Sequence, residues 1–172
     1  MKRMHANAVV LSLSLVLVAT GAAGQSSSIP AKTQFVGTWR LDSIHYVRPD
    51  GTKVEPFGPG AKGMLYFDAG GRFATQAMAA NRPRFVSNNR MTGTPEENKT
   101  ASQGVVAYFG TYSVDEAKRI LTLHIEMSSY PNWNRTDQIR RFKFVGDELR
   151  YTAPTSTANP AESAELVWRR AR

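Results

Sequence analysis

The stretch FVGTWRLDSIHYVRPDGTKV, residues 35–54, has the pattern of a first β-strand and the turn that ends it. Residues 37–48 are rich in β-branched and aromatic side chains, and Pro49-Asp50-Gly51 is a strong turn signal between two such runs. We therefore expect the fold to begin near Gly37, with Trp39 on its first strand.

The same unit of strand, turn and strand recurs along the rest of the chain. Turn signals at residues 69–71, 115–118 and 146–148 separate further runs with strand character. The pattern predicts eight strands, at residues 37–48, 62–68, 72–78, 107–114, 119–128, 137–145, 148–153 and 164–170. Eight strands in meander order most economically form an all-β, antiparallel, up-and-down barrel, because closure removes the exposed strand edges. A β-sandwich is the alternative.

One segment, residues 81–104, is too long for a hairpin loop and follows the third predicted strand. Within it, Thr94-Pro95-Glu96-Glu97 combines an N-cap, a proline at the first helical position and a glutamate three residues after the cap, so we expect one short helix over residues 95–105. Such an insertion either covers the barrel mouth or plugs the closed end. As a lid, it would cover the mouth with Pro83, Phe85 and Met91 and surround it with Arg82, Arg84 and Arg90.

Residues 1–24 differ in character from everything that follows. Lys2 and Arg3 precede an apolar run that ends in small residues, which is the layout of a secretory signal peptide. We expect cleavage after Ala23 or Gly24, a flexible leader over residues 25–34, and one barrel domain over residues 35–172. The protein would then be secreted or periplasmic, without stable membrane insertion; a retained membrane anchor is the alternative.

Charge and composition narrow the function classes. The chain has no cysteine, so its fold depends on the buried core without disulfides. Its net charge of +8 comes from basic residues scattered along strands and turns, which argues against nucleic acid as a partner and favours acidic ligands or surfaces. Outside residues 1–24 the only histidines are His45 and His124, so we expect no metal, and no sequence motif indicates a cofactor.

Trp39 has an architectural interpretation. An indole on the first strand fills the closed end of a barrel, where its N–H finds a partner. Arg169 and Arg170 on the last predicted strand are the cations that could stack on it.

The polar residues of two neighbouring strands are the best site candidates. On the strand 119–128, one face carries Leu121, Leu123, Ile125 and Met127, and the other carries Thr122, His124, Glu126 and Ser128. On the next strand, Gln138 and Arg140 share a face with Phe142 and Phe144. Two interpretations stay open at this point: the face with His124 and Glu126 is solvated, or it lines a lumen with a polar end.

Several segments resemble one known family. The stretch 35–73, GTPEE at 93–97, AYFGTYSVDE at 107–116 and PNWNRTDQIRRF at 131–142 resemble, in order, segments of the bacterial and fungal lipocalin-like domain family. The resemblance implies a calycin-type barrel that binds a small, hydrophobic molecule. It also favours the polar lumen, because His124, Glu126, Asn132, Trp133 and Gln138 fall on motif positions of the family. One departure is Asn134-Arg135-Thr136, where the family has a small Gly-Thr turn.

We therefore predict a protein that binds a small hydrophobic or amphipathic molecule, with an anionic head near Arg140. The predicted ligand-binding residues are Tyr66, His124, Glu126, Trp133, Gln138 and Arg140, with His124 and Glu126 pointing into the barrel. The alternative is an isomerase, cyclase or hydrolase in which Glu126 orients His124 as a general acid or base. The lack of a nucleophile or cofactor motif favours binding over catalysis.

Overall fold

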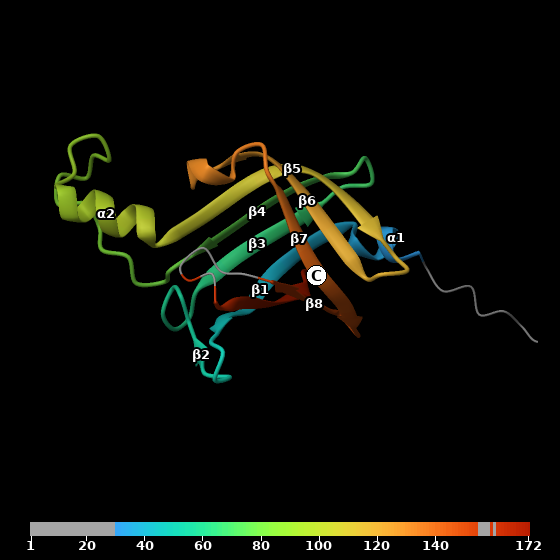
Figure 1. Ribbon diagram of the computed structural model, residues 1–172. Helices are drawn as coiled ribbons and strands as arrows, with labels where there is room; N and C mark the ends of the chain where they lie inside the picture. The colour runs from blue at the N-terminus through green and yellow to red at the C-terminus, as the bar shows by residue number, and fades with distance from the viewer. Residues whose placement is uncertain (1–29, 155–158, 160) are drawn as a thin grey trace, which may run out of the picture.

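The chain folds as an antiparallel β-barrel with a short helix at each end (Figure 1). The computed structural model describes residues 30–154, 159 and 161–172. Its elements are α1 (Ala31–Phe35), β1 (Gly37–Val47), β2 (Lys53–Val54), β3 (Lys62–Phe67), β4 (Arg72–Met78), α2 (Pro95–Gln103), β5 (Val105–Asp115), β6 (Ile120–Ser128), the 3-10 helix η1 (Pro131–Trp133), β7 (Asp137–Val145), β8 (Glu148–Ala153) and β9 (Ser163–Arg170). The predicted signal peptide and its cleavage position lie outside the described residues.

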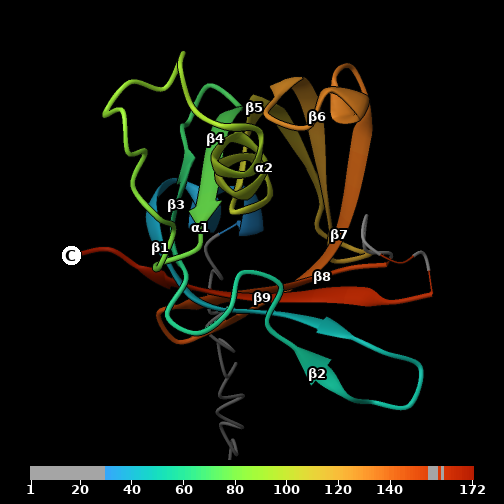
Figure 2. The same cartoon turned by 90° about the vertical axis from the view of Figure 1, so that its left-hand side faces the viewer.

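Strand order confirms the predicted barrel. The sheet runs β2-β1-β3-β4-β5-β6-β7-β8-β9, and β1 also pairs antiparallel with β9, so eight strands close on themselves (Figure 2). The two-residue strand β2 is an addition that pairs only with the far end of β1. The insertion with α2 follows β4, the third strand of the barrel, as expected. Closure rules out the β-sandwich alternative.

The closed end of the barrel is filled by aromatic side chains. Phe35, fully buried at the end of α1, makes edge-to-face contacts with Phe67, Phe142 and Phe144. Ala31 is buried on the same helix. Residues 31–34 therefore form a helix that helps plug this end, and the expectation of a flexible leader is wrong for them. Its N-cap residue, Pro30, makes no capping hydrogen bond, so hydrophobic contacts and the Glu116 carboxylate, which accepts from the Lys32 N–H at 3.2 Å, hold α1 in place.

Trp39 occupies this end as predicted. It is 1% exposed and its indole N–H donates to the Phe35 carbonyl at 2.8 Å. The Arg170 guanidinium lies over the indole, 4.1 Å from the ring centroid, and donates to the Val36 and Gln34 carbonyls. Gly37 makes this possible, since its φ of 129° favours glycine and a Cβ there would lie 2.9 Å from the guanidinium.

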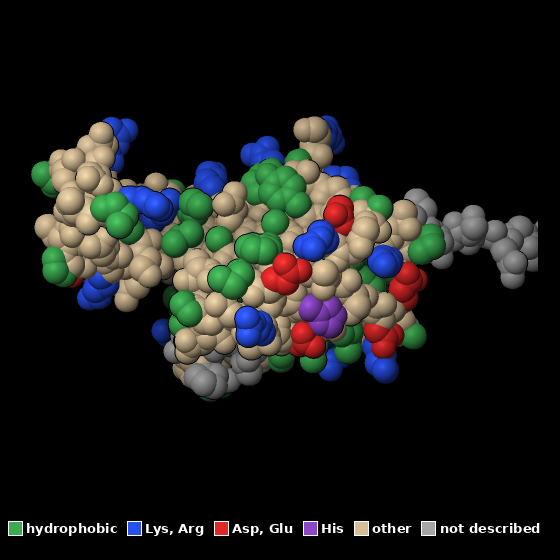
Figure 3. All heavy atoms as spheres, turned by 90° about the horizontal axis from the view of Figure 1, so that it is seen from above, with side chains coloured by type: hydrophobic (Ala, Val, Ile, Leu, Met, Phe, Trp, Pro, Cys, Tyr) green, Lys and Arg blue, Asp and Glu red, His purple; other side chains and the backbone are tan. Residues whose placement is uncertain are grey.

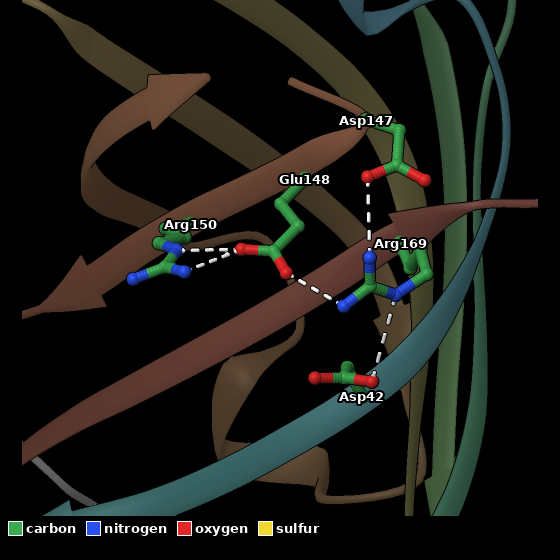
Figure 4. A network of polar contacts seen from close by, with 5 residues as sticks. All are labelled: Asp42, Asp147, Glu148, Arg150 and Arg169. Atoms are coloured by element: carbon green, nitrogen blue, oxygen red, sulfur yellow. Dashed lines mark hydrogen bonds and ion pairs between the residues drawn. The ribbon is translucent and has the colours of Figure 1, made fainter. Parts of the chain in front are cut away.

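Arg169 lies on the opposite face of β9, outside the barrel. Figure 4 shows its guanidinium between Asp42 of β1, Asp147 of the β7–β8 turn and Glu148 of β8. Glu148 also accepts two hydrogen bonds from Arg150. These charges cross the seam where β9 joins β1 and β8. Of the two candidate arginines, Arg170 is therefore the one that stacks on Trp39.

The helix α2 lies at the other end of the barrel from α1 (Figure 1). It begins with the predicted capping box, in which the Thr94 hydroxyl accepts from the Glu97 N–H and the Glu97 carboxylate accepts from the Thr94 N–H. It ends at Gln103, two residues earlier than expected, and Gly104 follows it. Among the described residues, no helix is long and apolar enough to cross a lipid bilayer.

Candidate functional site

A cavity of about 540 Å³ opens at the end of the barrel that carries α2. Its wall is mainly apolar and aromatic, and Trp39 is not part of it. It is lined by Ile44, Tyr46, Phe57, Thr75, Ala77, Ser102, Gln103, Val105, Val106, Tyr108, Ser129, Tyr130, Trp133, Gln138, Arg140, Tyr151, Ala153, Ala164, Leu166 and Trp168. Alternation along β7, β8 and β9 directs every second side chain inward, which explains the spacing of the lining residues on those strands.

Arg140 is the charged group of this cavity. Its side chain is held by Gln138 Oε1, which accepts from both terminal nitrogens at 3.2 Å, and by the Ile139 carbonyl at 2.9 Å. The residue is only 5% exposed, yet no carboxylate among the described residues pairs with it. Its Nε has no hydrogen-bond partner within the described structure. Arg140 is therefore a buried cation that lacks a counter-charge.

Two further buried polar atoms in the cavity wall lack a partner among the described residues. They are the hydroxyl of Tyr151 and the indole N–H of Trp168. Tyr108 and Trp168 lie close to the Tyr151 hydroxyl, but neither approaches it in hydrogen-bonding geometry. Burial raises the pKa of Tyr151, Tyr108 adds to this effect and Arg140 opposes it. The hydroxyl therefore stays protonated.

Three of the predicted binding residues line the cavity. Arg140 and Gln138 point inward from β7, as their shared face with Phe142 indicated. Trp133 lies on η1, with its ring edge-to-face against Tyr108. The structure therefore brings these three residues together at one cavity, and their role in ligand binding stays a prediction.

Tyr66 is not in the cavity. It follows buried Leu65 on β3, so its side chain points outward and is 43% exposed. There it lines a separate shallow depression of about 420 Å³, together with Phe109 and Met127. The expected proximity of Tyr66 to the polar site is wrong.

His124 and Glu126 also lie outside the barrel, so the predicted polar lumen on β6 is wrong. Leu121, Leu123 and Ile125 take the inner face. His124 Nδ1 lies 2.7 Å from Asp137 Oδ1, whereas Glu126 pairs with Arg72 at 3.3 Å. Figure 3 shows acidic and basic side chains close together on the outer surface seen from above. The pair proposed for acid–base chemistry is therefore divided between two different partners.

Ser113, His124 and Asp137 nevertheless have the connectivity of a serine-hydrolase triad. The Ser113 Oγ lies 3.1 Å from His124 Nε2 on the side opposite to Asp137. These residues lie on the outer face of three adjacent strands and line neither of the two described hollows. Because β6 is paired with β5 and β7, its backbone N–H groups are committed to the sheet and offer no preformed oxyanion hole. The arrangement is a polar cross-strand cluster rather than a catalytic site.

The insertion reaches the cavity only through the end of α2. Ser102 and Gln103 line the mouth. Phe85 instead packs near Gly93 within the insertion, and Met91 is 79% exposed. The apolar lid expected from Pro83, Phe85 and Met91 is therefore not formed, and the insertion projects away from the barrel (Figure 1).

Tyr151 and Trp168 were not predicted as site residues. Both follow from the period of two in their strands. On β8, Leu149, Tyr151 and Ala153 alternate with polar residues, and on β9 every second residue, Ala164, Leu166 and Trp168, is buried. The signal that identifies them is the polar atom that each of these inward aromatic side chains carries, because a buried polar atom needs a hydrogen-bond partner.

Comparison with known proteins agrees with this geometry. The family model described as the lipocalin-like domain matches residues 36–171. The chain belongs to the lipocalin-like domain family.

This lipocalin-like chain is also similar to a fungal carrier protein and to a solved structure. Over 105 residues it is 30% identical to the 4'-hydroxy-3'-methoxypropiophenone carrier protein ppsC of Aspergillus oryzae (strain ATCC 42149 / RIB 40), a match that covers 56% of this chain and 95% of the relative. Among solved structures, the crystal structure of a lipocalin-like protein from Bacteroides uniformis ATCC 8492 aligns with a TM-score of 0.41 and 15% identity, over 80% of this chain and 98% of that one.

Proposed function

We propose that this lipocalin-like protein is an exported carrier that binds a small amphipathic, aromatic molecule in the cavity at the open end of the barrel. The observation that carries the proposal is the cavity itself, whose 540 Å³ lies within the range of about 300 to 1,000 Å³ of small-molecule sites. Its apolar wall with a few polar groups is typical of such sites.

The relative from Aspergillus oryzae supports the ligand class. Its name describes a carrier of 4'-hydroxy-3'-methoxypropiophenone, a molecule with an apolar aromatic ring and polar oxygens at both ends. The cavity of this chain offers matching chemistry, because Tyr108, Trp133 and Trp168 provide aromatic surface and Arg140 provides hydrogen-bond donors.

Titration of the purified protein with 4'-hydroxy-3'-methoxypropiophenone tests this function. Trp133 and Trp168 line the cavity, so we expect saturable quenching of tryptophan fluorescence and one site by calorimetry. Ala164→Phe, which fills the cavity, should abolish binding. Ala117→Phe makes the same chemical change on an exposed turn and should leave binding unchanged. Equal binding by both variants would place the ligand elsewhere and contradict the proposal.

Export rests on the sequence of residues 1–24. The pattern of a basic start, an apolar run and small residues supports it. We expect mass spectrometry of the secreted or periplasmic protein to find an N-terminus at Gly24 or Gln25. A chain that is recovered from that compartment with Met1 still present would show that these residues are not a cleaved signal.

A further inference from the structure

The wall of the cavity includes three residues that each carry a buried polar atom without a hydrogen-bond partner. Within the described structure, the buried side-chain atoms without a hydrogen-bond partner are Arg140 Nε, Tyr151 Oη and Trp168 Nε1. All three residues line the same cavity and come from the adjacent strands β7, β8 and β9. Buried polar atoms are almost always satisfied in native proteins, so three exceptions in one wall call for an explanation.

The three side chains are contiguous. The Arg140 guanidinium lies 5.9 Å from the centroid of the Tyr151 ring, and the Tyr151 and Trp168 rings are 6.3 Å apart. We call Arg140, Tyr151 and Trp168 the polar floor. Two of its free atoms are N–H donors, and the third is a hydroxyl that can donate or accept.

The charge of the polar floor selects the partner. A buried guanidinium without a counter-charge is costly, because it has lost water without gaining an anion. The residues of the floor are between 1% and 5% exposed, and no described carboxylate reaches them. An anionic oxygen would supply both the counter-charge and the missing acceptor, whereas a cation would raise the cost.

The position of the polar floor sets the direction in which a ligand binds. Exposed Ser102, Gln103 and Tyr130 mark the mouth, while Val105 and Val106 lie partly exposed between the mouth and the interior. A polar group at the buried floor and apolar side chains nearer the mouth favour a ligand that enters with its charged head first. The exposed arginines of the insertion do not line the cavity.

We infer that the cavity is specific for organic anions, and that it holds the anionic oxygen of a carboxylate or phenolate against Arg140 Nε and Trp168 Nε1 with the apolar body towards the mouth. This rests on the proposed carrier function and adds to it the charge and orientation of the ligand. Tyr151, which remains protonated, contributes a third hydrogen bond to the same head group.

A set of matched probes tests the charge. Calorimetry would compare 4-phenylbutanoate, 4-phenylbutanamide and 4-phenylbutylamine, which share one skeleton and carry a negative, neutral and positive head. We expect the carboxylate to bind at least about tenfold more tightly than the amide and the amine not to bind. Arg140→Met should weaken binding of the carboxylate by at least about 30-fold, the range for one lost partner of a buried charge pair. It should change the affinity for the amide by less than about threefold. Arg141→Met, on the exposed outer face, should change neither.

The orientation has a separate readout in the wild-type protein, which does not depend on how Arg140→Met folds. In an indole ¹⁵N–¹H spectrum, the Trp168 N–H should shift downfield with 4-phenylbutanoate as it gains an acceptor. The Trp39 N–H, already bonded to the Phe35 carbonyl, should not move. If all three probes bind equally and Trp168 does not shift, the anion specificity is overturned while the carrier function stands. If no phenylbutyl probe binds but 4'-hydroxy-3'-methoxypropiophenone does, the anion specificity fails and the carrier function stands; if that ketone does not bind either, both proposals fail.

Discussion

Each end of the barrel contains a tryptophan and an arginine, and the two ends differ in whether the polar atoms of these side chains have partners. At the closed end, the Trp39 indole N–H has an acceptor and Arg170 stacks on the ring while donating to two carbonyls. In the cavity of the open end, Trp168 and Arg140 are 1% and 5% exposed, but each has a polar atom without a partner among the described residues. One tryptophan–arginine set is complete and the other is not.

This difference separates stability from binding. Phe35 fills the closed end, so burial there contributes directly to the free energy of unfolding. At the open end, about 540 Å³ is unfilled and the charge of Arg140 has no counter-charge. A bound ligand can fill this volume and compensate this charge, which the chain alone does not do. Substitutions at the two ends should therefore act on different measurements.

The largest expected effect is that of Trp39→Ala at the closed end. Removing a fully buried indole should lower the free energy of unfolding by about 3 to 5 kcal/mol. Urea unfolding followed by far-UV circular dichroism measures it, since fluorescence would be altered by the loss of the tryptophan itself. A loss below about 1 kcal/mol, the range of surface substitutions, would show that the closed end does not depend on this residue.

Arg170→Met should have the next largest effect. It removes a cation over an aromatic ring and two charge-assisted hydrogen bonds to carbonyls, so we expect a loss of about 2 to 3 kcal/mol. Arg172→Met removes a charge at an exposed position and serves as the matched control in the same urea titration. Equal losses in both variants would indicate a general effect of net charge rather than closure at Trp39.

Much of the fold was predictable from the sequence. Period-two alternation and turn signals located all eight barrel strands, and the capping box located α2. The helix α1 was missed because AKTQF has no capping side chain and owes its order to the tertiary burial of Phe35. Propensity carries no information about such a contact.

The candidate site was predicted less completely. The face shared by Gln138 and Arg140 with Phe142 gave the correct side of β7. For β6 the pattern left two orientations open, and the resemblance to the family favoured the wrong one. Leu121, Leu123 and Ile125 decide the orientation of β6. Turning their face outward would expose three large aliphatic side chains to water, whereas the observed orientation buries them and leaves His124 and Glu126 solvated.

At the open end, Arg140→Met should have the opposite sign from Arg170→Met, or none. Replacing a buried, uncompensated charge by an apolar side chain of similar length often leaves stability unchanged or raises it by 1 kcal/mol or more, about the range known for buried ion pairs. We expect the ligand-free variant to unfold in urea at the wild-type midpoint or above. A loss greater than about 1.5 kcal/mol would show that the hydrogen bonds of Arg140 to Gln138 and Ile139 are structural, and would remove the contrast between the ends.

The smallest effect concerns the outer seam beside the closed end, and it depends on pH. Hydrogen bonds and charge from Arg150, followed by the charge of Arg169, lower the pKa of Glu148 below its value in the unfolded chain. A carboxyl group whose pKa is lower in the folded state stabilises the fold above its unfolded pKa, near 4.5, and loses this contribution as the pH falls through the lower folded value. The wild type should therefore have a larger free energy of unfolding than Glu148→Gln. This difference should be greatest at pH 7 and vanish in acid. Urea midpoints of both proteins from pH 7 down to pH 3 measure it.

In an Arg150→Gln background the difference should shrink at pH 7, because Arg150 is the principal cause of the shift. A difference that persists in acid, or that is indifferent to Arg150, would assign the stabilisation to packing of the glutamate stem rather than to its charge.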